Sequence, residues 1–124
     1  MPSITIKRVY DSTDTSEGVR VLVDRVWPRG VSKQKLQAEH WLRDAAPSSA
    51  LRKWFDHDPK RWDEFKHRYW EELQGKPETV SFLLTLAQEQ GLTLLFSARD
   101  VRYNQAVALQ EYLLARLHTT SERS

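Results

Sequence analysis

The sequence predicts a small α/β protein with a mostly parallel sheet of three to four strands and helices on both faces. Two observations predict it. Residues 19–26 and 92–97 are apolar on both sides, which is typical of strands buried in the centre of a sheet. Helical patterns fill the chain between these two runs. A helical crossover between two strands implies parallel pairing with a right-handed connection.

The N-terminal part predicts two strands. Residues 4–10 begin with alternating apolar and polar side chains, which indicates a strand. Residues 11–18 form a polar loop that is too short for a helical crossover, so the direction of the first strand stays open. Residues 19–26 form the first buried strand, which Pro28 and Gly30 end.

The next segment predicts short elements. Ser32 is expected to cap a single helical turn through Leu36. Residues 38–42 fit a short edge strand, and a helix is the open alternative. Ser48 is expected to cap a helix that ends near Phe55.

Two longer helices follow. Asp58 and Pro59 are a capping residue followed by proline at the first helical position, which predicts a helix that runs to Leu73. Pro77 starts the next helix, and Gly91 ends it.

The chain then predicts a second buried strand over residues 92–97, a turn, and a last helix over residues 104–117. We expect residues 1–118 to form one domain and residues 119–124 to be a flexible tail.

Composition excludes several classes of site. The chain has 124 residues and no cysteine, so disulfides, thiolate zinc sites, iron–sulfur clusters and cysteine nucleophiles are ruled out. There is no P-loop and no dinucleotide-binding glycine pattern, so no cofactor is predicted. The sequence shows neither a signal peptide nor an apolar membrane span, and we expect a cytoplasmic protein.

Charged residues gather after the two buried strands. Asp24, Arg25 and Arg29 follow the first, and Arg99 and Asp100 follow the second. In open α/β sheets, ligands bind beyond the carboxyl ends of the strands. Guanidinium groups stay charged and bind carboxylate or phosphate through two hydrogen bonds. The sequence therefore predicts an arginine-rich crevice that binds a small anionic or phosphorylated ligand.

Other roles are assigned around these arginines. Asn104 and the start of the last helix would supply neutral donors to an anion, or Asn104 or Asp100 would cap that helix. Asp24 and Asp100 would orient the arginines or handle a proton, which makes them the candidates for catalysis. The alternative is a structural network of ion pairs that closes this end of the sheet. Whether the protein is an enzyme is left open.

A second candidate function rests on residues 51–73, which interleave tryptophans with arginines and lysines. Such helices suit a nucleic-acid or protein-binding module, or they place tryptophans in the core and charges in solvent. Asp56, His57 and Asp58 are the nearest approach to a metal motif. Adjacent residues seldom point at one ion, so no metal site is predicted.

One long motif spans the first buried strand and its end: Arg20-Val21-Leu22-Val23-Asp24-Arg25-Val26-Trp27-Pro28-Arg29-Gly30-Val31-Ser32. Further matching residues are Trp41, Ala46-Pro47-Ser48, Leu51-Arg52-Lys53-Trp54-Phe55, Phe65, Tyr69, Glu72-Leu73 and Leu94-Leu95-Phe96-Ser97-Ala98-Arg99-Asp100. With these motifs the chain resembles the YeaO-like proteins of the domain of unknown function 488 family, along nearly its whole length. The resemblance implies a small bacterial cytosolic α/β protein and no particular activity.

The chain departs from that family pattern at the start of the last helix. The family usually has Asn-His-Ala there, and this chain has Asn104-Gln105-Ala106. Glutamine donates and accepts hydrogen bonds but takes no proton at neutral pH, so a possible general base is missing at this position.

Overall fold

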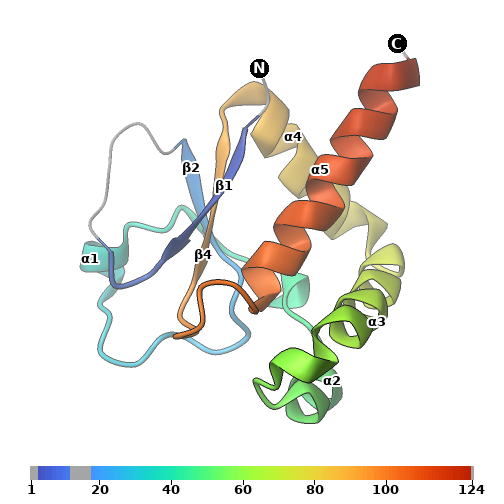
Figure 1. Ribbon diagram of the computed structural model, residues 1–124. Helices are drawn as coiled ribbons and strands as arrows, with labels where there is room; N and C mark the ends of the chain where they lie inside the picture. Colours follow the sequence, from blue (N-terminus) through green and yellow to red (C-terminus); the bar gives the residue numbers. More distant parts are fainter. Residues whose placement is uncertain (1–2, 12–17, 124) are drawn as a thin grey trace.

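The computed structural model describes residues 3–11 and 18–123, with side chains through residue 117. Within these residues, one sheet contains four strands, all paired in parallel, in the spatial order β1-β4-β2-β3 (Figure 1). The strands are β1 (Ile4–Arg8), β2 (Val19–Leu22), β3 (His40–Trp41) and β4 (Leu92–Phe96). The predicted α/β class is confirmed, and the first strand proves to run parallel to β4.

The described residues form five α-helices around the sheet. They are α1 (Lys33–Leu36), α2 (Ser49–Phe55), α3 (Trp62–Gln74), α4 (Pro77–Glu89) and α5 (Gln105–Arg123). Two 3-10 turns, η2 (Arg43–Ala45) and η3 (Pro59–Arg61), precede α2 and α3. Helices α3, α4 and α5 lie on one side of the sheet, and α1 lies on the other (Figure 1).

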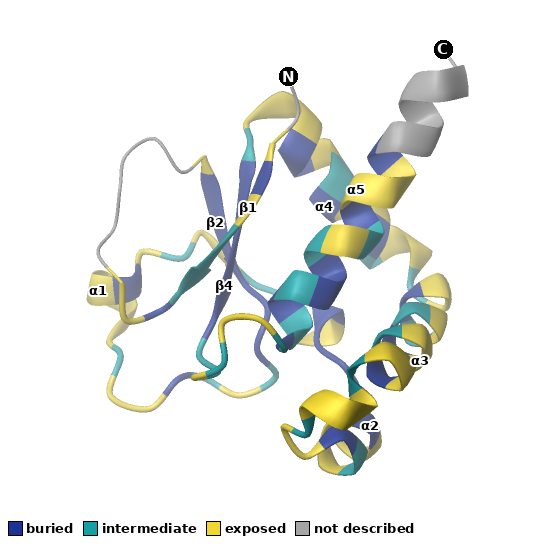
Figure 2. Ribbon diagram, viewed as in Figure 1, coloured by how far each residue is buried: buried dark blue, intermediate teal, exposed yellow. Residues whose placement is uncertain are grey.

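The two faces of the sheet are covered unequally, as the buried residues in Figure 2 show. Val21 and Leu94 point into a large core shared with α3, α4 and α5. Leu22 and Leu95 point the other way, into a small cluster with Leu36 of α1. Because neighbouring strand residues face opposite sides, this alternation accounts for strands that are apolar on both faces.

Strand β2 is shorter than the predicted span of residues 19–26. The Val23 N–H still donates to the Leu95 carbonyl (3.1 Å), but the sheet pairing stops there. The Asp24 carbonyl instead accepts from the Trp41 indole (2.8 Å). Here a side chain, and not a neighbouring strand, is the hydrogen-bond partner of the backbone. The strand therefore ends earlier than the apolar pattern of the sequence indicated.

Three of the predicted capping residues act as caps in the structure. Ser32 and Ser48 each accept a hydrogen bond from the backbone N–H three residues later, and Asp58 accepts from the Lys60 N–H. Asp58 caps the 3-10 turn η3, so the α-helix α3 begins only at Trp62. Residues 38–42 contain the edge strand β3 and no helix.

The last helix is longer than the predicted span, because α5 continues to Arg123. The side chains after Leu117 lie outside the described residues, and the predicted tail of residues 119–124 stays a prediction. Most of the predicted loop at residues 11–18 also lies outside the described residues.

Candidate functional site

A cavity of about 860 Å³ lies beyond the carboxyl ends of the central strands β2 and β4. Its lining residues are Asp24–Arg29, Ala46, Pro47, Ser49, Arg52, Lys53, Phe55, His57, Phe65, Ser97–Asp100 and Tyr103–Gln105. Because β2 and β4 are parallel neighbours, the segments that follow them converge here. The volume lies within the range of about 300–1,000 Å³ that small-molecule sites have.

All six residues predicted from the sequence line this cavity. They are Asp24, Arg25, Arg29, Arg99, Asp100 and Asn104. The structure thus brings the two strand ends together around one hollow. It also adds three lining residues that sequence reasoning missed as part of this site, which are Arg52, Lys53 and His57.

Asp24 is the buried acid of the cavity, with 6% of its surface exposed. One carboxylate oxygen accepts from the Ser97 backbone N–H (3.1 Å), and the other accepts from the Gln105 side-chain amide (2.6 Å). Burial raises the pKa of Asp24 above its ordinary value, while hydrogen bonds from Ser97 and Gln105 and the charge of Arg52 oppose that rise. Asp24 therefore ties the end of β2 to the end of β4 and to the start of α5.

The basic side chains that line the cavity make no close ion pairs in the part of the chain that the structure describes. Within the part of the chain that the structure describes, no carboxylate lies within 4.0 Å of the charged groups of Arg25, Arg29, Arg52, Lys53 or Arg99. Arg25 donates through Nε to the Pro47 carbonyl (3.2 Å), and that bond holds its guanidinium without cancelling its charge. The contacts thus give no sign of the structural ion-pair network that the sequence left open.

Asp100 and Asn104 shape the loop before α5. One oxygen of Asp100 accepts from the backbone N–H groups of Arg102 (2.9 Å) and Tyr103 (3.1 Å). The Asn104 side chain accepts from the Val107 N–H (3.0 Å) and donates to the Asp100 carbonyl (2.8 Å). Of the two caps that the sequence allowed for this helix, the structure uses Asn104. A direct ligand role for Asn104 stays a prediction.

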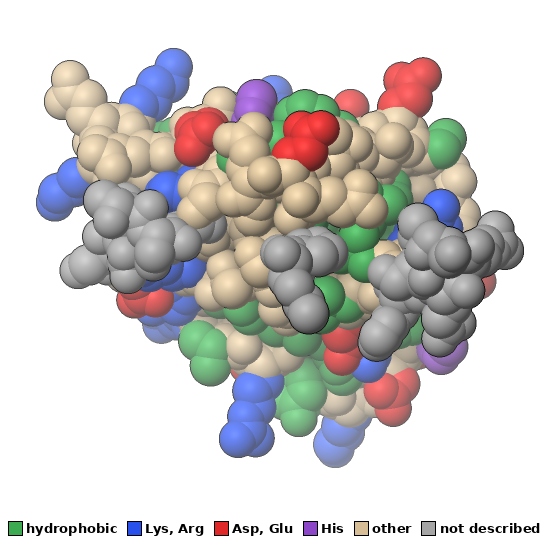
Figure 3. All heavy atoms as spheres, turned by 90° about the horizontal axis from the view of Figure 1, so that it is seen from above, with side chains coloured by type: hydrophobic (Ala, Val, Ile, Leu, Met, Phe, Trp, Pro, Cys, Tyr) green, Lys and Arg blue, Asp and Glu red, His purple; other side chains and the backbone are tan. Residues whose placement is uncertain are grey.

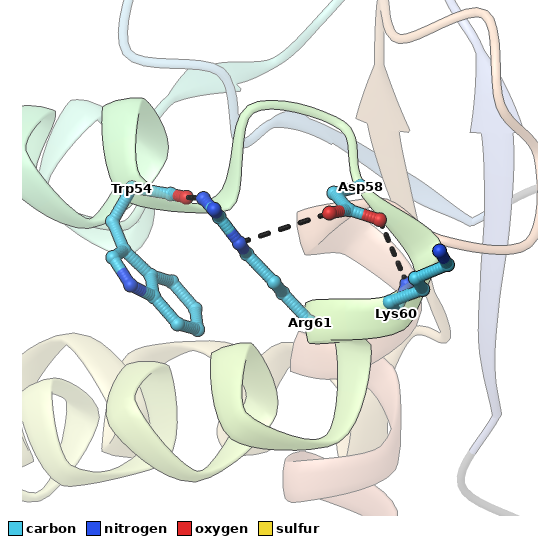
Figure 4. A network of polar contacts seen from close by, with 4 residues as sticks. All are labelled: Trp54, Asp58, Lys60 and Arg61. Atoms are coloured by element: carbon cyan, nitrogen blue, oxygen red, sulfur yellow. Dashed lines mark hydrogen bonds and ion pairs between the residues drawn. The ribbon is translucent and has the colours of Figure 1, made fainter.

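His57 reaches the cavity through an unusual turn. Asp56 and His57 have φ values of 47° and 54°, in the left-handed region that residues other than glycine seldom adopt. The bonds around the turn appear in Figure 4, where Arg61 donates to the Trp54 carbonyl and pairs with Asp58. Sequence reasoning assigned this segment only as a weak metal motif. The position of His57 depends on a left-handed backbone conformation that no pattern in the sequence predicts.

The tryptophans of residues 51–73 are covered by cations from the same segment. The pairs are Arg61 and Arg68 over Trp54, and Lys66 over Trp62 and Trp70, at 4.3–5.5 Å from the ring centroids. Trp54, Trp62 and Trp70 also pack against the main core. These contacts match the expectation of tryptophans in the core with charges outside, and a nucleic-acid or protein partner for these helices stays a prediction.

The opposite end of the molecule, where the strands begin, has a mixed character. Figure 3 shows basic and acidic side chains there side by side, without a gathering of one sign.

Within the described residues, no three potential ligands lie together to hold a metal ion. No helix of the described residues has the length and the apolar character needed to cross a membrane.

Residues 3–124 match a family model described as "Inactive DUF488-N3 subclade". The chain belongs to the DUF488 family. Among DUF488 relatives, the uncharacterized protein YeaO of Escherichia coli (strain K12) is 39% identical over 111 residues, which cover 90% of this chain and 96% of the relative. The uncharacterized protein Rv3073c of Mycobacterium tuberculosis (strain ATCC 25618 / H37Rv) is 38% identical over 113 residues, covering 91% and 95%. No solved structure gives a significant match.

Proposed function

We propose that this DUF488 protein binds a small anionic ligand, of which phosphate esters are the best fit, in the cavity beyond β2 and β4. The observation that carries the proposal is the charge of the lining. Four arginines and one lysine line one cavity that contains two carboxylates. In the described residues no carboxylate lies within ion-pair distance of these side chains, so their donors are available to a ligand.

The strand-end arginines are the proposed anion-binding groups. Arg25, Arg29 and Arg99 offer guanidinium donors that match two oxygens of a phosphate or carboxylate. Asp24 holds the strand ends together, and Asp100 and Asn104 hold the loop that carries Arg99. Asp24, Asp100 and Asn104 therefore position the backbone segments that carry the three arginines.

We propose binding without acid–base chemistry. The Gln105 amide lies 2.6 Å from Asp24, at the position where the family pattern usually has histidine. A histidine there would be paired with a buried carboxylate and would exchange protons near neutral pH, whereas the amide does not. The description "Inactive" for the matching subclade supports the same reading.

Calorimetric titration with inorganic phosphate and with sulfate tests the proposal. Arg25→Ala and Arg99→Ala should each weaken binding about 10- to 100-fold, since a hydrogen bond to a charged group contributes about 1.5–3 kcal/mol. Arg102→Ala is the matched control, because Arg102 lies in the same loop, is exposed, and does not line the cavity.

The wild-type protein failing to bind either anion would refute the proposal. Equal weakening by Arg99→Ala and Arg102→Ala would do so as well, because it would reduce the effect to overall charge.

A further inference from the structure

The basic residues that line the cavity fall into two groups from separate parts of the chain. Arg25, Arg29 and Arg99 form the strand-end group, which follows β2 and β4. The second group, which we call the α2 group, consists of Arg52, Lys53 and His57. Both groups line the same hollow.

The α2 group is fixed in place by bonds at both ends of its helix. At the start, Glu72 of α3 accepts from the Ser48 backbone N–H (2.8 Å) and hydroxyl (2.6 Å). The bond from Arg25 to the Pro47 carbonyl joins the strand-end group to the same point. At the other end, the Asp58 N–H donates to the Phe55 carbonyl (3.0 Å). Arg25 of the strand-end group and the start of α2 are thus held at two adjacent residues, Pro47 and Ser48.

The turn that follows α2 suggests that His57 is placed for a ligand. Asp56 is the left-handed C-cap of α2, and its N–H donates to the Arg52 carbonyl (3.1 Å). The left-handed backbone of His57 costs about 1–2 kcal/mol. Both side chains are exposed, so burial of apolar surface does not offset that cost. Such conformations gather at binding sites, where their use is to place a side chain. Here the turn brings an imidazole to the cavity beside Arg52 and Lys53.

The amount of charge and of space exceeds what one phosphate needs. A phosphoryl group carries about −1.5 to −2 charges at neutral pH. By formal charge, four arginines and one lysine against two carboxylates leave a larger positive excess than that. A single phosphate would also leave most of the cavity of about 860 Å³ empty.

We infer that the ligand carries two phosphoryl groups, one bound by the strand-end group and the other by the α2 group. This inference rests on the proposed function and adds the second subsite and the class of ligand. The lining also includes apolar residues, among them Phe55 and Ala98, which suit the organic part of such a molecule.

Calorimetry with matched pairs of probes tests the inference. Fructose 1,6-bisphosphate is compared with fructose 6-phosphate, and inorganic pyrophosphate with inorganic phosphate. The first pair reports two separated phosphoryl groups, and the second reports two adjacent ones. We expect at least one doubly phosphorylated probe to bind about 30-fold tighter or more than its partner, which corresponds to about 2 kcal/mol.

A double variant, Lys53→Ala with His57→Asn, isolates the second subsite. Asparagine adopts left-handed backbone readily, so the turn is kept while the imidazole is removed. This variant should reduce the ratio to below about threefold, because it removes two of the three side chains of the second subsite. Lys60→Ala is the charge control, because Lys60 lies on the neighbouring turn η3 and does not line the cavity.

The outcomes separate the two proposals. Binding of phosphate without any preference for two phosphoryl groups would overturn this inference and leave the proposed function intact. An unchanged ratio in the double variant, or an equal loss in Lys60→Ala, would also overturn it. Absence of binding for every probe would instead refute the proposed function itself.

Discussion

For Asp24, the sequence predicted the location of the residue in the site but not its hydrogen-bond partners. Its position after a buried strand, beside Arg25, indicated a partner for the arginines. In the structure its oxygens accept from Ser97 and Gln105, and in the described residues no arginine lies within ion-pair distance of it. The residue types were enough to locate the site. The partners depended on which backbone and side-chain donors the fold brought to the carboxylate.

The raised pKa of Asp24 predicts a pH dependence of stability. Below the ordinary carboxyl pKa, Asp24 is protonated in both the folded and the unfolded protein, and its contribution is fully present. As the pH rises through the folded-state pKa, the buried carboxylate becomes charged and that contribution is lost. Asp24→Asn should remove this loss. The variant should therefore be at least as stable as the wild type at pH 7 and gain no advantage near pH 3.

Thermal melts of both proteins from pH 3 to pH 8 measure this difference. The side-chain amide at position 24 can still accept from the Ser97 N–H, and the Gln105 amide can rotate to accept from it in turn. If the two stability profiles stayed parallel over the whole range, the account of Asp24 would be wrong.

At the scale of elements, the strand positions depend on a close approach between the starts of β2 and β4. The Val19 N–H donates to the Gly91 carbonyl (3.0 Å). Gly18 has φ of 72°, and a Cβ at this position would lie 2.6 Å from the Gly91 carbonyl oxygen. The sequence indicated a turn ending at Gly18, but only the tertiary structure shows that the backbone of another strand occupies the space of a side chain.

Gly18→Ala should lower the free energy of unfolding by at least about 1–2 kcal/mol, because it adds the left-handed cost to a steric clash. Gly75→Ala is the control. Gly75 has φ of −83°, and its nearest neighbour to an added Cβ is at 3.4 Å, an ordinary contact. We expect that control to be neutral or to gain about 0.4–1 kcal/mol. Urea unfolding of the three proteins measures both values, and equal effects would contradict the close approach.

At the scale of the whole molecule, the two faces of the sheet differ in how much core they bury. In the described residues, the cluster on the α1 face has four buried members, Val9, Leu22, Leu36 and Leu95. Arg20 ties α1 to the sheet by donating from Nε (3.1 Å) and Nη2 (2.7 Å) to the Leu36 carbonyl. The other face carries the long helices and the larger core.

This inequality predicts where the protein opens first. Local opening takes less free energy where fewer apolar contacts are broken. Backbone amides of α1 and β3 should therefore exchange with deuterium at least about tenfold faster than those of β4, as measured by hydrogen exchange with mass spectrometry. Protection of α1 equal to that of β4 would show that the small cluster is as stable as the large one.

The sequence by itself determined the class of fold, the helix starts and the strand-end arginines, because caps, prolines and apolar periodicity act over a few neighbouring residues. The tertiary structure alone decided the strand order, the early end of β2 and the joining of α2 to the cavity. Arg52, Lys53 and His57 became part of the site because α2 packs on α3 and the turn at 56–57 is left-handed. Contacts between distant segments and rare backbone conformations leave no periodic trace in a sequence, so they had to be observed.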